Sequence, residues 1–214
     1  MSSKESFTSQ LNFFSKYYRV IAPDFTGFGQ SKSMEYPYRL NDYVNEIKNL
    51  LQILNVDEFD VIAHSFGARV ALKLALDGEN INKLLLTGAA GLKPKRSLKY
   101  YFKVYYYKTL KKLFPNKSFE NFGSKEYKLL NGVMKQSFVY IVNEHLDDVA
   151  SKIKTKTLIL SGDKDEQTPP YMQKRLNKKL QNSTLTFLKG EGHFAFVTKP
   201  YTFNLLAREF LLGD

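Results

Sequence analysis

FDVIAHSFG, residues 59–67, is the stretch that decides the fold. Its first five residues form an apolar, β-branched run typical of a buried strand, and the residues after it follow a helical pattern. Between them lies Ser65, with the small residues Ala63 and Gly67 two positions away on either side. A serine at a tight strand-to-helix turn has an exposed hydroxyl, as a nucleophile requires. We therefore expect Ser65 to be catalytic and the backbone N–H of Phe66 to face a developing oxyanion.

Similar short apolar runs recur along the chain and alternate with helical patterns. Strands are expected at residues 18–22, 59–63, 83–87, 157–161 and 184–188, and helices at 40–54, 66–76, 171–180 and 200–212. Near-continuous apolarity is typical of strands that are buried on both faces of a parallel sheet. Alternation with helices predicts crossover connections. The expected fold class is α/β, a mostly parallel sheet with flanking helices.

One long segment interrupts this alternation. Residues 91–150 contain no strand-like run and are rich in Lys, Tyr and Phe. We interpret them as a helical cap inserted between two strands. The expected organisation is residues 1–90 as the first part of the core, 91–150 as the cap and 151–214 as the second part of the core.

Two further loops carry candidate catalytic side chains. SGDKD, residues 161–165, follows a predicted strand and offers two carboxylates, Asp163 and Asp165. GEGHF, residues 190–194, follows the last predicted strand and places His193 just after two glycines, on a flexible loop. In a parallel sheet such loops meet at one edge, the carboxyl ends of the strands. A histidine there can take the proton of a serine, while an aspartate fixes the imidazole tautomer.

The order Ser, Asp, His, each placed just after a strand, resembles the α/β-hydrolases, a superfamily of esterases, lipases and C–C hydrolases. DFTGFGQS, residues 24–31, matches the family's loop after an early core strand. The resemblance extends from about residue 6 to the end of the chain. It implies a triad of Ser65, His193 and Asp165, because Asp165 stands three residues past Gly162 as in the family's loop. Asp163 is the less favoured carboxylate.

The beginning of the chain departs from the family pattern. Family members carry further strands upstream and a His-Gly loop that supplies a second oxyanion N–H, whereas no His-Gly pair precedes Tyr18 here. We therefore interpret the sequence as truncated at its N-terminus. Loss of one oxyanion donor costs about 10²–10³ in rate. The expectation is a weak or inactive hydrolase with a bared sheet edge that favours self-association.

The chain is strongly basic, with a net charge of +11, and much of this charge lies in the cap. Residues 93–112 combine lysines with aromatic residues and contain no acidic residue. Three interpretations stay open: a lid whose aromatic side lines the acyl pocket, a peripheral contact with an anionic membrane, or nucleic-acid binding. The lid is favoured and nucleic acid is not expected as a partner.

Other residue classes narrow the function further. The chain has no cysteine, which excludes disulfides and thiolate metal sites, and its three histidines are scattered. We expect no metal and no cofactor. His64 is expected to pack or hydrogen-bond rather than to catalyse. The first residues do not resemble a secretory signal and no apolar run approaches the roughly 20 residues of a membrane span, so a cytoplasmic location is expected.

The predicted activity is hydrolysis of a small ester-like substrate. A thioester, a lactone or a C–C bond is cleaved by the same three residue types, and fold does not choose among them. Two interpretations outside this class also stay open: a non-catalytic remnant and a basic binding module.

Overall fold

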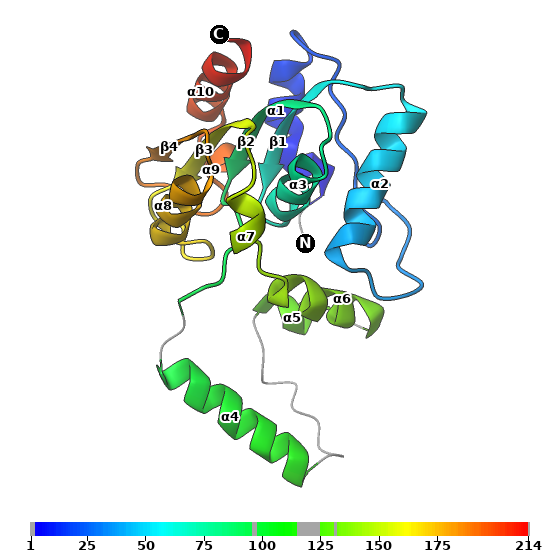
Figure 1. Cartoon of the computed structure of the whole chain (residues 1–214), viewed down its shortest axis with the longest axis vertical. Coiled ribbons are helices and arrows are strands. Elements are labelled where there is room, and N and C mark those ends of the chain that lie inside the picture. The colour runs from blue at the N-terminus through cyan, green and yellow to red at the C-terminus, as the bar shows by residue number, and fades with distance from the viewer. Residues whose placement is uncertain (1–2, 96–97, 115–124, 131, 214) are drawn as a thin grey trace.

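The computed structural model describes residues 3–95, 98–114, 125–130 and 132–213 (Figure 1). Its core is a sheet of four parallel strands in the order β1-β2-β3-β4. The strands are β1 (Phe59–His64), β2 (Ile81–Thr87), β3 (Lys156–Gly162) and β4 (Ser183–Leu188). Strand order therefore follows chain order, and each strand is joined to the next by at least one helix. The α/β class predicted from the alternation is confirmed.

Helices cover both faces of this sheet (Figure 1). The core helices are η1 (Lys4–Phe7), α1 (Thr8–Phe14), α2 (Leu40–Ile53), α3 (Phe66–Leu76), α8 (Pro170–Lys179), α9 (Ala195–Thr198) and α10 (Pro200–Leu212). Leu84 and Leu86 of β2 face a cluster that includes residues of α2, α3 and α8. Leu85, between them, faces a second cluster that includes residues of α1, α9 and α10. Because side chains alternate along a strand, one apolar run supplies both layers of the core.

The strand expected at residues 18–22 is absent, and this prediction was wrong. The segment has no regular secondary structure, although it is as apolar as the runs that became strands. Within the described residues, β1 is one of the two edge strands of the sheet, and no strand pairs with residues 18–22. Apolar composition favours burial, but a strand also needs a neighbour that satisfies its N–H and C=O groups.

The segment between β2 and β3 contains the helices α4 (Leu98–Leu113), α5 (Lys125–Leu129), α6 (Gly132–Asn143) and α7 (Asp147–Ala150). Buried Arg69 of α3 joins α6 to the core, since its Nη1 donates to the carbonyl oxygens of Ile141 (2.9 Å) and Glu144 (2.8 Å). Burial lowers the pKa of Arg69 to about 10, so it stays charged at neutral pH. A cation at the carboxyl end of α6 also complements the helix dipole. α4, by contrast, lies away from the α/β body (Figure 1).

Candidate active site

Ser65 sits on the sharp turn between β1 and α3. Its φ of 49° is in the left-handed region, which the structure otherwise shows for a described non-glycine residue only at Asn55. Such a backbone is strained for an L-residue and persists where its surroundings hold it. The Ser65 N–H donates to the carbonyl of Thr87 (3.1 Å), and the Ser65 carbonyl accepts from Ala68 (3.2 Å). The turn therefore fixes the serine between two core elements.

The residue after the serine begins helix α3. The first N–H groups of a helix have no acceptor within the helix, so the N–H of Phe66 is available to an anion, and the helix dipole favours one there. The Phe66 ring stacks on Phe28, with centroids 5.5 Å apart, and meets Tyr43 edge-on at 4.9 Å. These contacts anchor the start of the helix beside the turn.

The space around Gly67 is larger than expected for a residue at a tight strand-to-helix turn. A Cβ added to Gly67 would meet the Cβ of Ala63 at 3.9 Å, an ordinary contact distance. The requirement for a small residue at this position therefore admits alanine.

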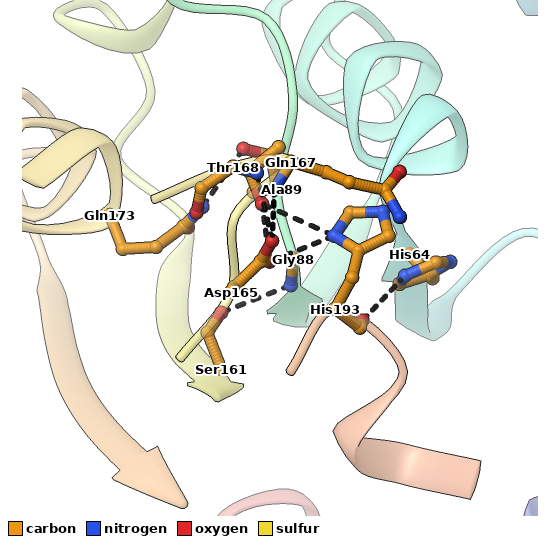
Figure 2. A network of polar contacts seen from close by, with 9 residues as sticks. All are labelled: His64, Gly88, Ala89, Ser161, Asp165, Gln167, Thr168, Gln173 and His193. Carbon is orange, nitrogen blue, oxygen red and sulfur yellow. Dashed lines mark hydrogen bonds and ion pairs between the residues drawn. The ribbon is translucent and has the colours of Figure 1, made fainter. Parts of the chain in front are cut away.

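Asp165 and His193 meet directly at the carboxyl edge of the sheet (Figure 2). His193 Nδ1 lies 2.8 Å from Asp165 Oδ2, and the two side chains are 5% and 0% exposed. The carboxylate also accepts from Thr168 Oγ1 (2.7 Å) and from the backbone N–H groups of Gln167 (2.8 Å) and Thr168 (2.9 Å). With Nδ1 as the donor, Nε2 is the acceptor nitrogen of a neutral imidazole.

The pKa of Asp165 is lowered to about 2. Burial alone raises this pKa, but the hydrogen bonds from His193 and Thr168 favour the charged form and outweigh burial. Asp165 is therefore a carboxylate throughout the neutral range. Asp163 instead accepts the N–H of Gly190 (2.7 Å) and braces the two loops. Of the two aspartates, Asp165 is the one that contacts the histidine.

Two glycines allow these loops to approach so closely. A Cβ on Gly88, at φ 51°, would lie 2.9 Å from His193 Nδ1. A Cβ on Gly162 would lie 2.2 Å from the carbonyl oxygen of Glu191. The Gly88 N–H donates to the buried hydroxyl of Ser161 (3.0 Å), which fixes the loop after β2 under the histidine (Figure 2).

His64 packs beside His193, with ring centroids 4.6 Å apart. Its Nε2 lies 3.0 Å from the carbonyl oxygen of His193, and only a protonated nitrogen can donate to a carbonyl (Figure 2). Burial, together with the neighbouring His193, lowers the pKa of His64 to about 4. His64 is thus a neutral donor that holds the backbone of the histidine loop, in keeping with the packing or hydrogen-bonding role expected.

A family model described as the alpha/beta hydrolase fold matches residues 2–103 and 79–200. The chain belongs to the alpha/beta hydrolase family. It is 27% identical over 218 residues to the AB hydrolase superfamily protein YisY of Bacillus subtilis, covering 90% of this chain and 81% of that protein. It is 37% identical over 76 residues to a 2-hydroxymuconate semialdehyde hydrolase of a Pseudomonas species, covering 35% of this chain and 27% of that protein.

Solved structures show the same fold. The esterase EaEST of Exiguobacterium antarcticum superposes with a TM-score of 0.78 at 22% identity, covering 99% of this chain and 88% of that one. The first relatives in sequence match over shorter stretches: the aligned region spans 22% of the mycobacterial proteins Rv2715 and its counterparts. The similar proteins thus include one named as an esterase and one named as a 2-hydroxymuconate semialdehyde hydrolase.

A cavity of about 1610 Å³ opens beside the candidate residues Ser65 and His193. Ser65, Phe66 and His193 line it together with side chains of α6, among them Phe138 and Val142. It also reaches the edge of β1 and the segment of residues 18–25. No described side chain of α4 lines this cavity. The lid interpretation of the basic aromatic segment therefore finds no support in the described side chains.

The sequence did not single out several residues that shape this site: Gly88, Ser161, Thr168 and Gln173. Gln173 is fully buried and donates to the carbonyl oxygens of Ala89 (3.1 Å) and Thr168 (3.2 Å), which ties two site loops together. Their signal is weak, since Gly88 and Ser161 are ordinary residues at strand ends, Thr168 lies in the loop after β3 and Gln173 lies within α8. A glycine directly after a predicted strand, as at position 88, was the one local hint.

No group of three or more His, Asp or Glu side chains suited to a metal ion occurs among the described residues. Within the same residues, no helix is long and apolar enough to cross a membrane.

Proposed function

We propose that this hydrolase cleaves carboxylic esters, with Ser65 as nucleophile, His193 as general base and Asp165 as the group that orients the base. The observation that carries the proposal is the 2.8 Å contact between His193 Nδ1 and Asp165 Oδ2, beside a cavity that both His193 and the strained Ser65 line. Buried carboxylate–imidazole pairs beside an exposed serine are the usual way to activate a hydroxyl.

The proton transfers follow from the assigned tautomer. Nε2 of His193 takes the Ser65 hydroxyl proton as Oγ attacks the carbonyl carbon, and the N–H of Phe66 binds the oxyanion that forms. The imidazolium, held by Asp165, returns the proton to the leaving alkoxide. In the second half of the reaction, Nε2 of His193 takes a proton from a water molecule as that water attacks the acyl-enzyme, and then returns the proton to Ser65 Oγ as the carboxylic acid leaves. Asp165 stays ionised throughout, as its low pKa requires.

Within the part of the chain that the structure describes, no hydrogen bond joins Ser65 Oγ to the His193 ring. Such contacts are often long in ligand-free enzymes and shorten when substrate is bound. The proposal therefore includes a movement of the histidine loop toward Ser65, and the glycines of that loop at 190 and 192 have room around them.

A fluorophosphonate probe tests the nucleophile, because it labels activated serines. We expect labelling of the wild type and of Ser151→Ala, an exposed serine remote from the site, and none of Ser65→Ala. Asp165→Asn should label far more slowly than Asp163→Asn. Labelling that persists in Ser65→Ala would refute the assignment. Unlabelled wild type would favour the non-catalytic remnant instead.

Substrate class is tested by turnover. The cavity is lined mainly by apolar side chains, which suits an acyl chain or an aromatic group. p-Nitrophenyl esters of two to eight carbons should be hydrolysed by the wild type at rates above the background that remains in Ser65→Ala. The relative that acts on 2-hydroxymuconate semialdehyde makes C–C cleavage the second candidate. A vinylogous diketone cleaved faster than any ester would replace the ester assignment; thioesters and lactones complete the panel.

A further inference from the structure

The most basic stretch of the chain surrounds helix α4. No aspartate or glutamate occurs between Glu79 and Glu120, although lysines are frequent there. Lys108, Lys111 and Lys112 of α4 are exposed. Because the stretch contains no acidic residue, α4 carries positive charge and no negative charge along its own length.

α4 also exposes large apolar side chains. Phe102 is 74% exposed, Tyr105 72%, Tyr106 59% and Leu113 65%. At 100° per residue these four positions fall within one stripe of the helix surface, and Lys112 lies at its border. Soluble proteins rarely leave such a stripe uncovered without a binding role. We call these four residues the α4 stripe.

The α4 stripe is not part of the catalytic cavity. None of its side chains lines that cavity, whose cap wall comes from α6. Figure 1 shows α4 apart from the sheet and its flanking helices. With respect to the described part of the chain, the stripe is therefore open to a partner outside the molecule.

We propose that α4 binds the surface of an anionic lipid bilayer, with the α4 stripe at the level of the headgroups and its lysines on anionic phosphates. Tyrosine and phenylalanine favour this interfacial depth, and flanking lysines add attraction to acidic lipids. Leu113 and Phe114 are exposed at the end of the helix. Bases of a nucleic acid stack on aromatic rings and not on leucine, so the exposed Leu113 favours lipid as the partner. Lipid therefore fits the stripe better than nucleic acid does.

The consequence goes beyond the proposed ester hydrolysis. A bilayer bound through α4 would bring the cavity near a lipid phase, so membrane-dissolved esters would reach Ser65 at raised local concentration. The binding itself needs no chemistry at the site. It can thus be measured on Ser65→Ala, and its failure is distinguishable from failure of the catalytic proposal.

The chain contains no tryptophan, which permits a direct probe of insertion. Phe102→Trp places one reporter in the α4 stripe, and Tyr201→Trp places a control at an equally exposed site on α10. With vesicles of phosphatidylcholine and about 30% phosphatidylserine, an acidic surface of the kind that attracts lysines, the emission of the Phe102→Trp variant should shift to shorter wavelength and be quenched by brominated lipid. The control should show neither effect. Absence of both effects at position 102 would overturn the proposal.

Sedimentation with the same vesicles tests the two contributions separately. Each lysine near an anionic surface is worth roughly fivefold in binding, so Lys108→Gln/Lys111→Gln/Lys112→Gln should weaken binding by about 100-fold. The matched set Lys16→Gln/Lys152→Gln/Lys154→Gln removes the same charge from exposed sites elsewhere and should change binding by less than tenfold. Phe102→Ser/Tyr105→Ser/Tyr106→Ser should also release the protein. Equal losses from both lysine sets, or salt-sensitive binding to single-stranded RNA with none to vesicles, would refute a lipid site on α4.

Discussion

Gly88→Ala gives the sharpest test of how the candidate site is held. The new Cβ would lie 2.9 Å from Nδ1 and 3.0 Å from Cε1 of His193, and 3.2 Å from Nε2 of His64. Non-bonded carbon contacts relax to about 3.5–4.0 Å, so the His193 ring has to move by roughly 0.5–1 Å. That movement lengthens the 2.8 Å bond to Asp165, because Asp165 is held by its own backbone contacts.

The expected loss of activity follows from that bond. A hydrogen bond to a charged group contributes about 1.5–3 kcal/mol, which corresponds to roughly 10- to 150-fold in kcat/KM if it is lost in the transition state. Alanine at a positive φ adds about 1–2 kcal/mol of strain and lowers the free energy of unfolding. Both effects are measurable, by ester turnover or by the rate of fluorophosphonate labelling, and by urea unfolding.

Gly78→Ala separates the two effects. Gly78 has φ 84° with nothing within 4 Å of an added Cβ, so alanine there is strained without touching a neighbour. We expect both variants to lose similar stability and only Gly88→Ala to lose activity. If Gly88→Ala reacted within twofold of the wild type while losing the same stability as Gly78→Ala, the idea that Gly88 sets the position of His193 would be wrong.

Three further changes test the Asp165–His193 pair and the turn that holds Ser65. The pKa of Asp165 is about 2, below its ordinary 3.8, so the carboxylate stabilises the fold above about pH 4 and this contribution is lost as pH falls toward 2. Between about pH 7 and 2.5 the wild type should therefore lose about 1–2 kcal/mol more unfolding free energy than Asp165→Asn. Urea unfolding of both proteins at the two pH values measures this difference. Thr168→Val removes the 2.7 Å bond to Asp165 Oδ2 but keeps the backbone donor, and should lower kcat about tenfold with KM nearly unchanged; an unchanged kcat would assign Thr168 to packing alone. Gly67→Ala, whose Cβ meets Ala63 at 3.9 Å, should retain activity within about threefold and gain up to about 1 kcal/mol of stability from helix propensity; a hundredfold loss would restore the strict small-residue requirement.

The parts of the site that the sequence predicted are those fixed by local order along the chain. Ser65, Asp165 and His193 each follow a run that became a strand, and parallel strands bring their carboxyl ends to one edge. The choice of Asp165 over Asp163 needed the family's loop as a guide, since both carboxylates follow the same strand. Position along the chain alone left the two equivalent.

The parts that escaped prediction depend on neighbours distant in sequence. Residues 18–22 resemble a strand in composition, yet strand formation is decided by a pairing partner, which no local pattern reveals. Gly88 matters because the His193 loop passes over it from more than a hundred residues away. The exposure of the α4 stripe likewise depends on where α4 lies in the fold, and the lysines and aromatic residues of 93–112, for which a lid was the favoured prediction, do not reveal that position.

All four strands contribute to the candidate site, each in a different way. The turn after β1 holds Ser65 in a strained conformation, and the loop after β2 contains Gly88, whose missing Cβ leaves room for the His193 ring. The loop after β3 carries Asp165 and the loop after β4 carries His193. Hydrogen bonds also join the ends of neighbouring strands: the N–H of Ser65, after β1, donates to the carbonyl of Thr87 in β2, and the N–H of Gly88, after β2, donates to the hydroxyl of Ser161 in β3. Because these strand ends are hydrogen-bonded to each other, a movement of one should displace the next. For this reason the position of His193 relative to Ser65 depends on residues that touch neither reacting atom, and backbone changes at strand ends should affect catalysis more than side-chain changes on the faces of the sheet.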